Sequence, residues 1–286
     1  MTTMTQLNAA ESNESGWTTE QLTSDQTAGR ALENYAASGR SALIRIRTQD
    51  THWEYGVDPD KPYRAASLLK LGIAIAVEDE IRRGSIDPDV DISVRELGSH
   101  PDDHSVLDLL DPKTILQLRN VIALMIGASD NTCTRWLLAL IGVNTVQTAI
   151  TSVGCAATTI EAQTDGGVPV AGVTTCRDAL DLLSVATDPD RYPITSHALR
   201  HSIRNSRIPL GATAADINIS HKTGSLPGLA HDVAVVECDS GQVDIAFLTD
   251  DQHDTLVAGY AMGICTREVL AAWGLSTIHT ISVDSE

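Results

Sequence analysis

The sequence predicts an α/β fold of the α+β type: an antiparallel sheet of about five strands, flanked by N- and C-terminal helices, stands beside an all-helical lobe. Three observations support this. Apolar and polar residues alternate near both ends of the chain, as is typical of strands. The long middle of the chain shows helical spacing of its apolar residues. The last predicted element is again a helix, so segments from both ends of the sequence should share one sheet.

The N-terminal part predicts a helix followed by a β-hairpin. Residues 1–16 are polar, and we expect them to be disordered. A helix should begin near Thr18 or Thr19, either of which can cap it, and extend to about residue 38. The stretches "SALIRIRT" and "THWEYGVD" then alternate apolar and polar residues around a short polar connection, which predicts two paired strands.

The middle of the chain, from Ser67 to about Thr187, predicts a series of helices. Their sequences are "SLLKLGIAIAVEDEIRRG", "KTILQLRNVIALMIGAS", "NTCTRWLLALIG", "NTVQTAITSVG" and "TTCRDALDLLSVAT", with a shorter helix at "TSHALRHSI". Strand patterns return at "DINISHKTG", "AHDVAVVECD" and "VDIAFLTD", before a helix at 255–273. We therefore expect an α/β lobe from residues 17–60 and 213–286, an all-helical lobe from residues 61–212, and an active-site cleft between them.

The charge and composition of the chain disfavour some classes of binding partner. The formal net charge of −18 disfavours nucleic acid and anionic membranes, because binding to phosphates requires clustered cations. No run of about 18 apolar residues predicts a membrane span. The first twenty residues lack a basic start and an apolar stretch, which favours a cytoplasmic protein, while a secreted form whose signal has been removed stays open. The pattern does not indicate an oligomeric state.

No metal ion or cofactor is expected. The cysteines are odd in number, widely spaced and without a C-x-x-C pattern, so they indicate buried thiols rather than disulfides or zinc ligands. They are Cys133, Cys155, Cys176, Cys238 and Cys265. His197 and His201 have the i, i+4 spacing of a zinc pair, but no third ligand is evident.

Three short motifs indicate catalytic chemistry. They are Ser67-x-x-Lys70, Ser129-Asp130-Asn131 and Lys222-Thr223-Gly224. Residues three apart share a helix face, so the Lys70 amine can reach the Ser67 hydroxyl and make it a nucleophile. Lys70 can act as this base only if burial and a second cation lower its pKa, and Lys222 is the candidate cation.

The other motif residues have expected roles around this pair. Ser129 lies on a tight connection between two helices, where it can bond Lys222 and relay a proton to a leaving amine, while Asn131 holds Lys70 and a substrate carbonyl.

The predicted strand "HKTGSLPG" should bind the substrate along its edge. Thr223, Gly224 and Ser225 are the expected contacts, with glycine where a substrate backbone comes close. The amides of Ser67 and Ser225 would form an oxyanion hole.

Each motif alone also has a purely structural explanation. Ser67 could be a helix cap, Asp130 and Asn131 a pair of caps, and Lys222 a surface lysine on a strand. Ser-x-x-Lys is a weak signal by itself. The other two motifs are rarer, and all three fall on the element that the chemistry requires, so together they favour catalysis.

With these motifs, the chain resembles the class A β-lactamase and penicillin-recognising serine hydrolase superfamily over about residues 28–280. The segments "LRNVIALMIGASDNTCTRWLLALIG" and "HKTGSLPGLAHDVAVVECDSGQVDIAFLT" are similar to the family's central helices and strand-turn-strand region. The resemblance implies a β-lactamase/transpeptidase-like fold and an acyl-enzyme on Ser67, with Lys70, Ser129 and Lys222 as the other catalytic residues.

One feature of that family is missing. Class A β-lactamases carry a Glu-x-x-Leu-Asn pattern whose glutamate activates the water that releases the acyl group. The corresponding stretch here, "TTIEAQTDGGVPVAGVTT", lacks the pattern. Its carboxylates, Glu161 and Asp165, fit solvated loop acids better than a deacylating base, although both stay candidates.

We therefore expect a serine hydrolase that forms an acyl-enzyme on Ser67 from an amide, β-lactam or ester substrate, with slow or atypical deacylation. The first alternative is a penicillin-binding-type peptidase or acyltransferase, and the second is a catalytically silent binding protein. Two lysines kept at the motif positions argue against the silent protein, because buried ammonium groups are costly.

Overall fold

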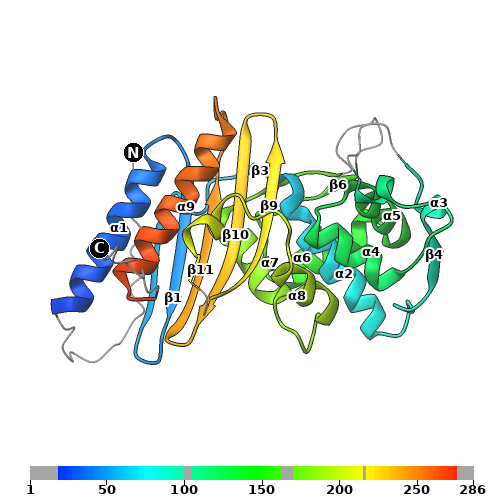
Figure 1. Cartoon of the computed structure of the whole chain (residues 1–286), viewed down its shortest axis with the longest axis horizontal. Helices are drawn as coiled ribbons and strands as arrows, with labels where there is room; N and C mark the ends of the chain where they lie inside the picture. The colour runs from blue at the N-terminus through cyan, green and yellow to red at the C-terminus, as the bar shows by residue number, and fades with distance from the viewer. Residues whose placement is uncertain (1–18, 100–104, 163–169, 215–216, 276–286) are drawn as a thin grey trace, which may run out of the picture.

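The computed structural model describes residues 19–99, 105–162, 170–214 and 217–275. Its centre is a five-stranded antiparallel sheet, as the sequence predicts (Figure 1). The strands are β1 (Ser41–Arg47), β2 (His52–Val57), β9 (Asn218–Leu226), β10 (Leu229–Cys238) and β11 (Gly241–Leu248). Their order is β2-β1-β11-β10-β9, so the N-terminal hairpin pairs with the last strand of the chain.

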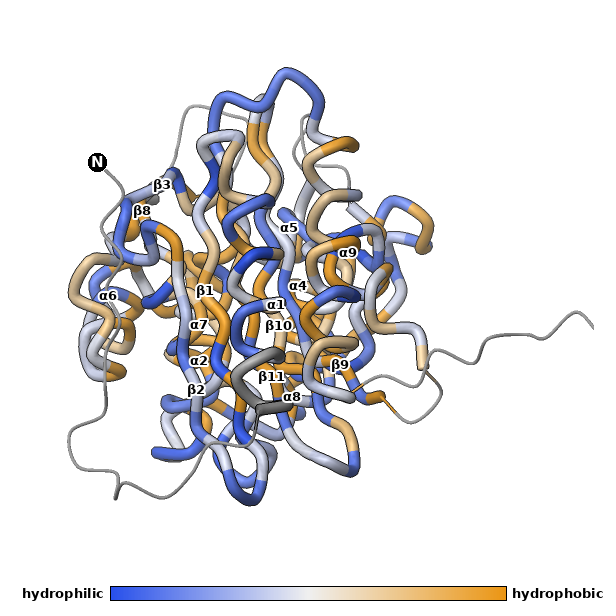
Figure 2. The backbone as a smooth tube through the Cα atoms, turned by 90° about the vertical axis from the view of Figure 1, so that its left-hand side faces the viewer, coloured by the Kyte–Doolittle hydropathy of each residue, from blue (hydrophilic) through white to orange (hydrophobic). Residues whose placement is uncertain are grey.

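Both faces of the sheet are buried, and side chains alternate between two apolar cores. In β1, Ala42 and Ile44 belong to one core, while Leu43 between them belongs to the other. In β11, Ile245 and Ala246 divide in the same way. The apolar colouring of the sheet and of the helices beside it is visible in Figure 2.

The two terminal helices, α1 (Thr19–Ala36) and α9 (Thr255–Ala272), pack against each other and cover one face of the sheet (Figure 1). Tyr35 of α1 meets Phe247 of β11 with ring centroids 4.5 Å apart. The Asp254 carboxylate caps α9 by accepting the amides of Leu256 and Val257. These contacts join the two ends of the chain on one side of the sheet.

The other face of the sheet meets the helical side of the molecule. Its main helices are α2 (Lys70–Arg82), α4 (Leu118–Gly127), α5 (Asn131–Ile141), α6 (Val143–Ser152), α7 (Cys176–Ala186) and α8 (Pro193–Arg200). Helix α2 is buried at every position from Lys70 to Asp79, as befits an apolar helix surrounded by others. A Cβ at Gly72 would lie 2.6 Å from the Ile150 side chain, so glycine lets α6 pack closely.

Several short elements differ from the sequence predictions. The helix predicted from Lys113 begins only at Leu118, because residues 115–117 pair with another strand. The helix predicted from Ser67 begins with a 3₁₀ turn. The additional elements are η1 (Ala66–Leu69), α3 (Val94–Leu97), η2 (Val106–Leu109), η3 (Ile208–Gly211) and the strand pairs β3–β8 (Tyr63–Arg64, Val173–Thr174), β4–β5 (Asp91–Ser93, Ile115–Gln117) and β6–β7 (Glu161–Ala162, Val170–Ala171). The expected disorder of residues 1–16 lies outside the described residues.

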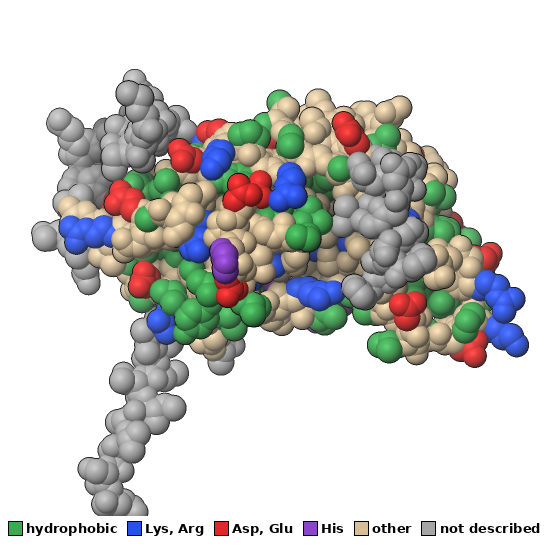
Figure 3. Space-filling model, turned by 90° about the horizontal axis from the view of Figure 1, so that it is seen from above, with side chains coloured by type: hydrophobic (Ala, Val, Ile, Leu, Met, Phe, Trp, Pro, Cys, Tyr) green, Lys and Arg blue, Asp and Glu red, His purple; other side chains and the backbone are tan. Residues whose placement is uncertain are grey.

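The five cysteines are free thiols; four are buried and Cys238 is half-buried, so the expectation of buried thiols holds for four. Within the described ranges, no helix combines the length and apolar character that crossing a bilayer requires. Acidic and basic side chains lie next to one another on the face shown in Figure 3.

Candidate active site

Ser67 lies in η1, the turn that leads directly into α2, and is partly exposed. Ala66 immediately before it has a φ of +49°, which is rare for a residue with a Cβ and costs on the order of 1 kcal/mol. The Ala65 amide donates to the Gly172 carbonyl at 2.9 Å and so anchors this turn. Because the first amides of a helical turn have no acceptor within it, the Ser67 N–H is suited to bind an oxyanion.

Lys70, the first residue of α2, is only 1% exposed and does not extend to solvent. Its Nζ donates to the Ser129 carbonyl at 2.5 Å and to Asn131 Oδ1 at 2.8 Å. It also lies 3.3 Å from Ser129 Oγ and 3.4 Å from the Asp130 carbonyl. The buried amine is therefore bound by the turn between α4 and α5.

This turn is fixed by Asp130, whose carboxylate is structural. Its Oδ1 accepts the Cys133 amide at 2.9 Å and caps α5, while its Oδ2 accepts from Ser105 Oγ at 2.7 Å and from the Val106 amide at 2.9 Å. Ser129 has a φ of +60°, another strained position. The cap interpretation thus holds for Asp130, whereas the Asn131 side chain faces Lys70.

Lys222 on β9 is also 1% exposed. Its Nζ donates to Ser129 Oγ at 2.9 Å and to the Thr223 carbonyl at 2.9 Å. The Ser129 hydroxyl therefore lies between the two amines. Burial, followed by the nearby charge of Lys70, lowers the pKa of Lys222 well below its usual value.

The neighbouring residue on β9, His221, faces away from this cluster, as strand alternation predicts. Its Nδ1 lies 3.1 Å from Asp232 Oδ1, and its Nε2 lies 3.0 Å from Asn205 Oδ1. The other carboxylate oxygen of Asp232 accepts the Ile208 amide at 3.0 Å. Asp232 is therefore a structural carboxylate.

Gly224 brings β9 close to the nucleophile turn. A Cβ there would lie 3.3 Å from the Ala65 carbonyl oxygen and 3.2 Å from Cδ2 of His231. The glycine is thus explained by contacts within the protein, whereas the sequence suggested the approach of a substrate backbone. His231 Nε2 donates to the Arg64 carbonyl at 2.8 Å, and its Nδ1 accepts the Thr249 amide at 3.2 Å, which connects the sheet to the segment before Ser67.

Arg207 is a site residue that sequence reasoning missed. Its guanidinium donates to the Gly224 carbonyl at 2.8 Å, to the His231 carbonyl, and to the hydroxyl of exposed Ser225 at 2.5 Å. Burial lowers the pKa of this arginine from its usual value. No local pattern identifies it, because its partners are 17 to 24 residues further along the chain.

The remaining predicted residues lie outside the hydrogen-bonded chain of Lys70, Ser129 and Lys222. Thr223 is buried next to Lys222, and Glu161 is exposed on β6. Asp165 lies outside the described residues. The His197 and His201 rings contact each other with centroids 4.2 Å apart, and the described part of the chain contains no cluster of three potential metal ligands.

The geometry suits proton transfer beside a nucleophile. A hydroxyl held between two buried amines can pass a proton from one side to the other, and a serine placed one helical turn before the first amine can be activated by it. Three separate elements supply the groups: the start of α2, the α4–α5 turn and β9.

Comparisons with known proteins identify the family and the fold. The family described as "Beta-lactamase enzyme family" matches residues 23–273. A β-lactamase structure from Sphaerobacter thermophilus DSM 20745 is 25% identical, with a TM-score of 0.76, and the match covers 88% of this chain and 98% of that one. A β-lactamase from Chitinophaga pinensis DSM 2588 is 21% identical (TM-score 0.73; 87% and 99% covered), and PBP-A is 19% identical (TM-score 0.72; 87% and 96% covered). No curated protein matches the sequence.

Proposed function

Because the chain belongs to the beta-lactamase enzyme family and has its class A-like serine hydrolase fold, we propose that Ser67 forms an acyl-enzyme with an amide, β-lactam or ester substrate. One observation carries this proposal: Lys70, three residues after Ser67, and Lys222 on β9 both bond Ser129 Oγ, so the three motifs meet in one hydrogen-bonded chain. A polar cluster that only stabilises the fold does not require two buried amines around a single hydroxyl, because burying each ammonium group costs free energy.

In the proposed acylation, neutral Lys70 accepts the Ser67 proton as Ser67 Oγ bonds to the substrate carbonyl carbon. The amides of Ser67 and Ser225 stabilise the oxyanion. When the bond between carbonyl carbon and leaving nitrogen breaks, Ser129 donates its proton to that nitrogen and recovers one from Lys70. The net result moves one proton from Ser67 to the leaving group, while the Lys222 amine orients Ser129.

We also propose that the substrate carries an acidic group, which binds at the exposed Ser225 hydroxyl. That hydroxyl oxygen accepts from Arg207, so its own hydrogen is directed elsewhere and can be donated to a carboxylate. The positive charge of Arg207 behind it favours an anionic partner.

Deacylation is proposed to be slow. Glu161 is exposed on β6, and the sequence lacks the glutamate pattern that activates water in class A β-lactamases. A persistent acyl-enzyme would fit the alternative of a penicillin-binding-type peptidase or acyltransferase, whose acceptor need not be water.

The test is to incubate the protein with a labelled penicillin and follow its mass over time, with Ser67→Ala as the control. An adduct that persists for hours supports slow deacylation, and one that appears and then disappears within minutes supports an efficient β-lactamase. If the wild-type protein forms no adduct, or if Ser67→Ala forms one at the same rate, the proposed mechanism is wrong.

A further inference from the structure

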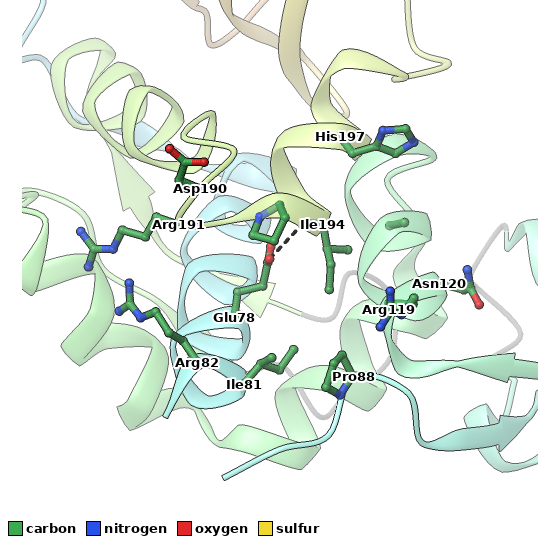
Figure 4. Close-up of a pocket in the computed structure, with 12 residues that line it drawn as sticks. Glu78, Ile81, Arg82, Pro88, Arg119, Asn120, Asp190, Arg191, Ile194 and His197 are labelled. Atoms are coloured by element: carbon green, nitrogen blue, oxygen red, sulfur yellow. Dashed lines mark hydrogen bonds between the residues drawn. The ribbon is translucent and has the colours of Figure 1, made fainter. Parts of the chain in front are cut away.

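A cavity lies on the helical side of the molecule, at the end of α2 that is remote from Ser67. Its volume is about 530 Å³, within the range of small-molecule sites. It is formed by the C-terminal end of α2, the N-terminal half of α4 and the start of α8 (Figure 4). Ile81 in this cavity is eleven residues after Lys70 on α2, so the two are about 16 Å apart along the helix.

The centre of the cavity is apolar. Ile81, Pro88 and Ile194 lie between the charged groups in the view of Figure 4, and Ala123 and Pro193 complete this surface. Ile81, Ala123 and Ile194 are partly exposed where they pack against the main core. A ligand with an apolar body would remove this surface from water, which is favourable in proportion to the area covered.

The rim of the cavity is basic on one side. Arg82 and Arg191 lie side by side there (Figure 4), and both approach the same oxygen of Asp79, at 2.7 Å and 3.9 Å. Their side chains are 47% and 45% exposed, so a good part of each guanidinium faces solvent. Each guanidinium carries five N–H donors, so two that share one carboxylate oxygen keep donors for an added anion.

The other acidic groups around the cavity offset the charge of the arginines, but two of them, Glu78 and Asp89, make their bonds away from Arg82 and Arg191. Glu78 is buried, and its two carboxylate oxygens accept the Ile194 and Thr195 amides at the start of α8. Arg119 on the opposite side bonds Asp89. Asp190 is the remaining carboxylate that lines the cavity, and it is exposed.

From this arrangement we propose that the cavity is a binding site, separate from the candidate active site, for a small organic anion with a compact apolar body. The anionic group bonds the guanidinium groups of Arg82 and Arg191, and the apolar body covers Ile81, Pro88 and Ile194. Arg is well suited to this role because its planar donors match a carboxylate or sulfonate.

The test uses 8-anilinonaphthalene-1-sulfonate as the probe, because this molecule joins an aromatic body to one anionic group. Fluorescence titration of the folded wild-type protein should show one saturable site, and the probe should raise the melting temperature, since a ligand of the native state stabilises it. No saturable site, or a lowered melting temperature, would overturn the proposal.

Matched variants locate the site. Arg82→Gln should weaken probe binding at least about tenfold, whereas Arg83→Gln should change it less than about twofold. Arg82 is the last residue of α2 and Arg83 its C-cap, and each pairs with an acid three residues earlier. Ala123→Phe should fill the cavity and abolish binding, while Ala139→Phe on exposed α5 surface should not.

Two further controls complete the test. Leu256 is 82% exposed on α9, so Leu256→Ser checks that the probe does not bind this apolar surface instead. N-Phenyl-1-naphthylamine lacks the sulfonate and should bind the wild-type protein at least about fivefold more weakly. Equal binding by Arg82→Gln and Arg83→Gln, or loss of binding in Leu256→Ser, would contradict the proposed site.

Discussion

Two polar clusters near opposite edges of the sheet, one at β1 and β2 and one at β9, illustrate different uses of charge. At β1, β2 and α7, Arg45 bonds Glu54 at 2.8 Å and Asp181 at 2.5 Å. Arg177 bonds Glu54 at 2.8 Å and Asp60 at 2.7 Å. Every cation in this ion-pair network has carboxylate partners, and the network ties α7 to the edge of the sheet.

The cluster of Lys70, Ser129 and Lys222 is built differently. Among the described residues, the hydrogen-bond partners of Lys222 are a hydroxyl and a carbonyl oxygen, and another lysine is close by. Burial and then Lys70 lower the pKa of Lys222. In the network, burial lowers the pKa of Arg45, but its bonds to Asp181 and Glu54 outweigh this and raise it.

The comparison distinguishes a cluster of paired opposite charges from a cluster of like charges. Where opposite charges meet, each favours the charged form of the other, and the pair holds elements together. Where buried amines meet, each disfavours the charge of the other, and the pKa of Lys222 is lowered accordingly.

The largest expected effect is at the nucleophile and its base. Ser67→Ala and Lys70→Ala should each lower the rate of acylation by penicillin at least about 1,000-fold, because the attacking oxygen or its proton acceptor is lost. The rate is measured by mass spectrometry of the adduct. Lys113→Ala, at an exposed lysine, is the control. A near wild-type acylation rate in Ser67→Ala or Lys70→Ala would contradict a catalytic role for the lysine cluster and so remove its contrast with the ion-pair network.

The next effect concerns the proton relay. Ser129→Ala and Lys222→Ala should slow acylation about 100-fold, a typical contribution of a positioned proton donor. His221→Gln, one residue away on the opposite face of β9, should leave the acylation rate within about threefold. Equal losses of acylation rate in Lys222→Ala and His221→Gln would indicate that the integrity of β9, rather than the Lys222 amine, determines the rate.

A buried histidine allows a test by pH. Burial lowers the pKa of His231 from 6.5 to about 4, against the opposing effect of its bond to the Arg64 carbonyl. The folded state therefore favours the neutral ring, and this stabilisation is complete above pH 6.5 and is lost as the pH falls toward 4. It amounts to about 3 kcal/mol.

The check is denaturant unfolding of wild type and His231→Asn at pH 7 and pH 4. Between pH 7 and pH 4, the free energy of unfolding of the wild-type protein should fall by about 3 kcal/mol more than that of the variant, because Asn can hydrogen-bond but does not titrate. The same pH dependence in both proteins would show that His231 is not the group responsible.

The smallest expected effect is in the ion-pair network. Arg177→Gln should lower the free energy of unfolding by about 1 kcal/mol, since its side chain is 25% exposed and solvent screens its pairs. The acylation rate should not change. Arg83→Gln, which breaks an exposed pair within one helix, should cost less than about 0.5 kcal/mol. A marked loss of acylation in Arg177→Gln would blur the distinction between the two clusters.

Much of the fold follows from local pattern. The hairpin at residues 41–57 and the strands at 218–248 could be predicted because β-branched and other apolar residues recur along them between short polar turns. Helix α4 was predicted to start too early, because residues 115–117 pair with β4, a contact that no local pattern contains. The strand pairs β3–β8 and β6–β7 were missed for the same reason: two-residue strands carry too few residues to show a period.

The candidate site also has features that local sequence predicts and features that depend on tertiary packing. The sequence by itself determined the chemical groups and their elements: a serine one turn before a lysine, a serine on an interhelical turn and a lysine on a strand, because motif spacing and periodicity are local properties. Only the tertiary structure decided that Ser129 Oγ lies between two buried amines, that Gly224 makes room for Ala65 and His231, and that Arg207 reaches Ser225. The hydrogen bonds among these contacts join residues 18 to 93 positions apart, and their geometry depends on how helices and strands pack, which local sequence does not encode.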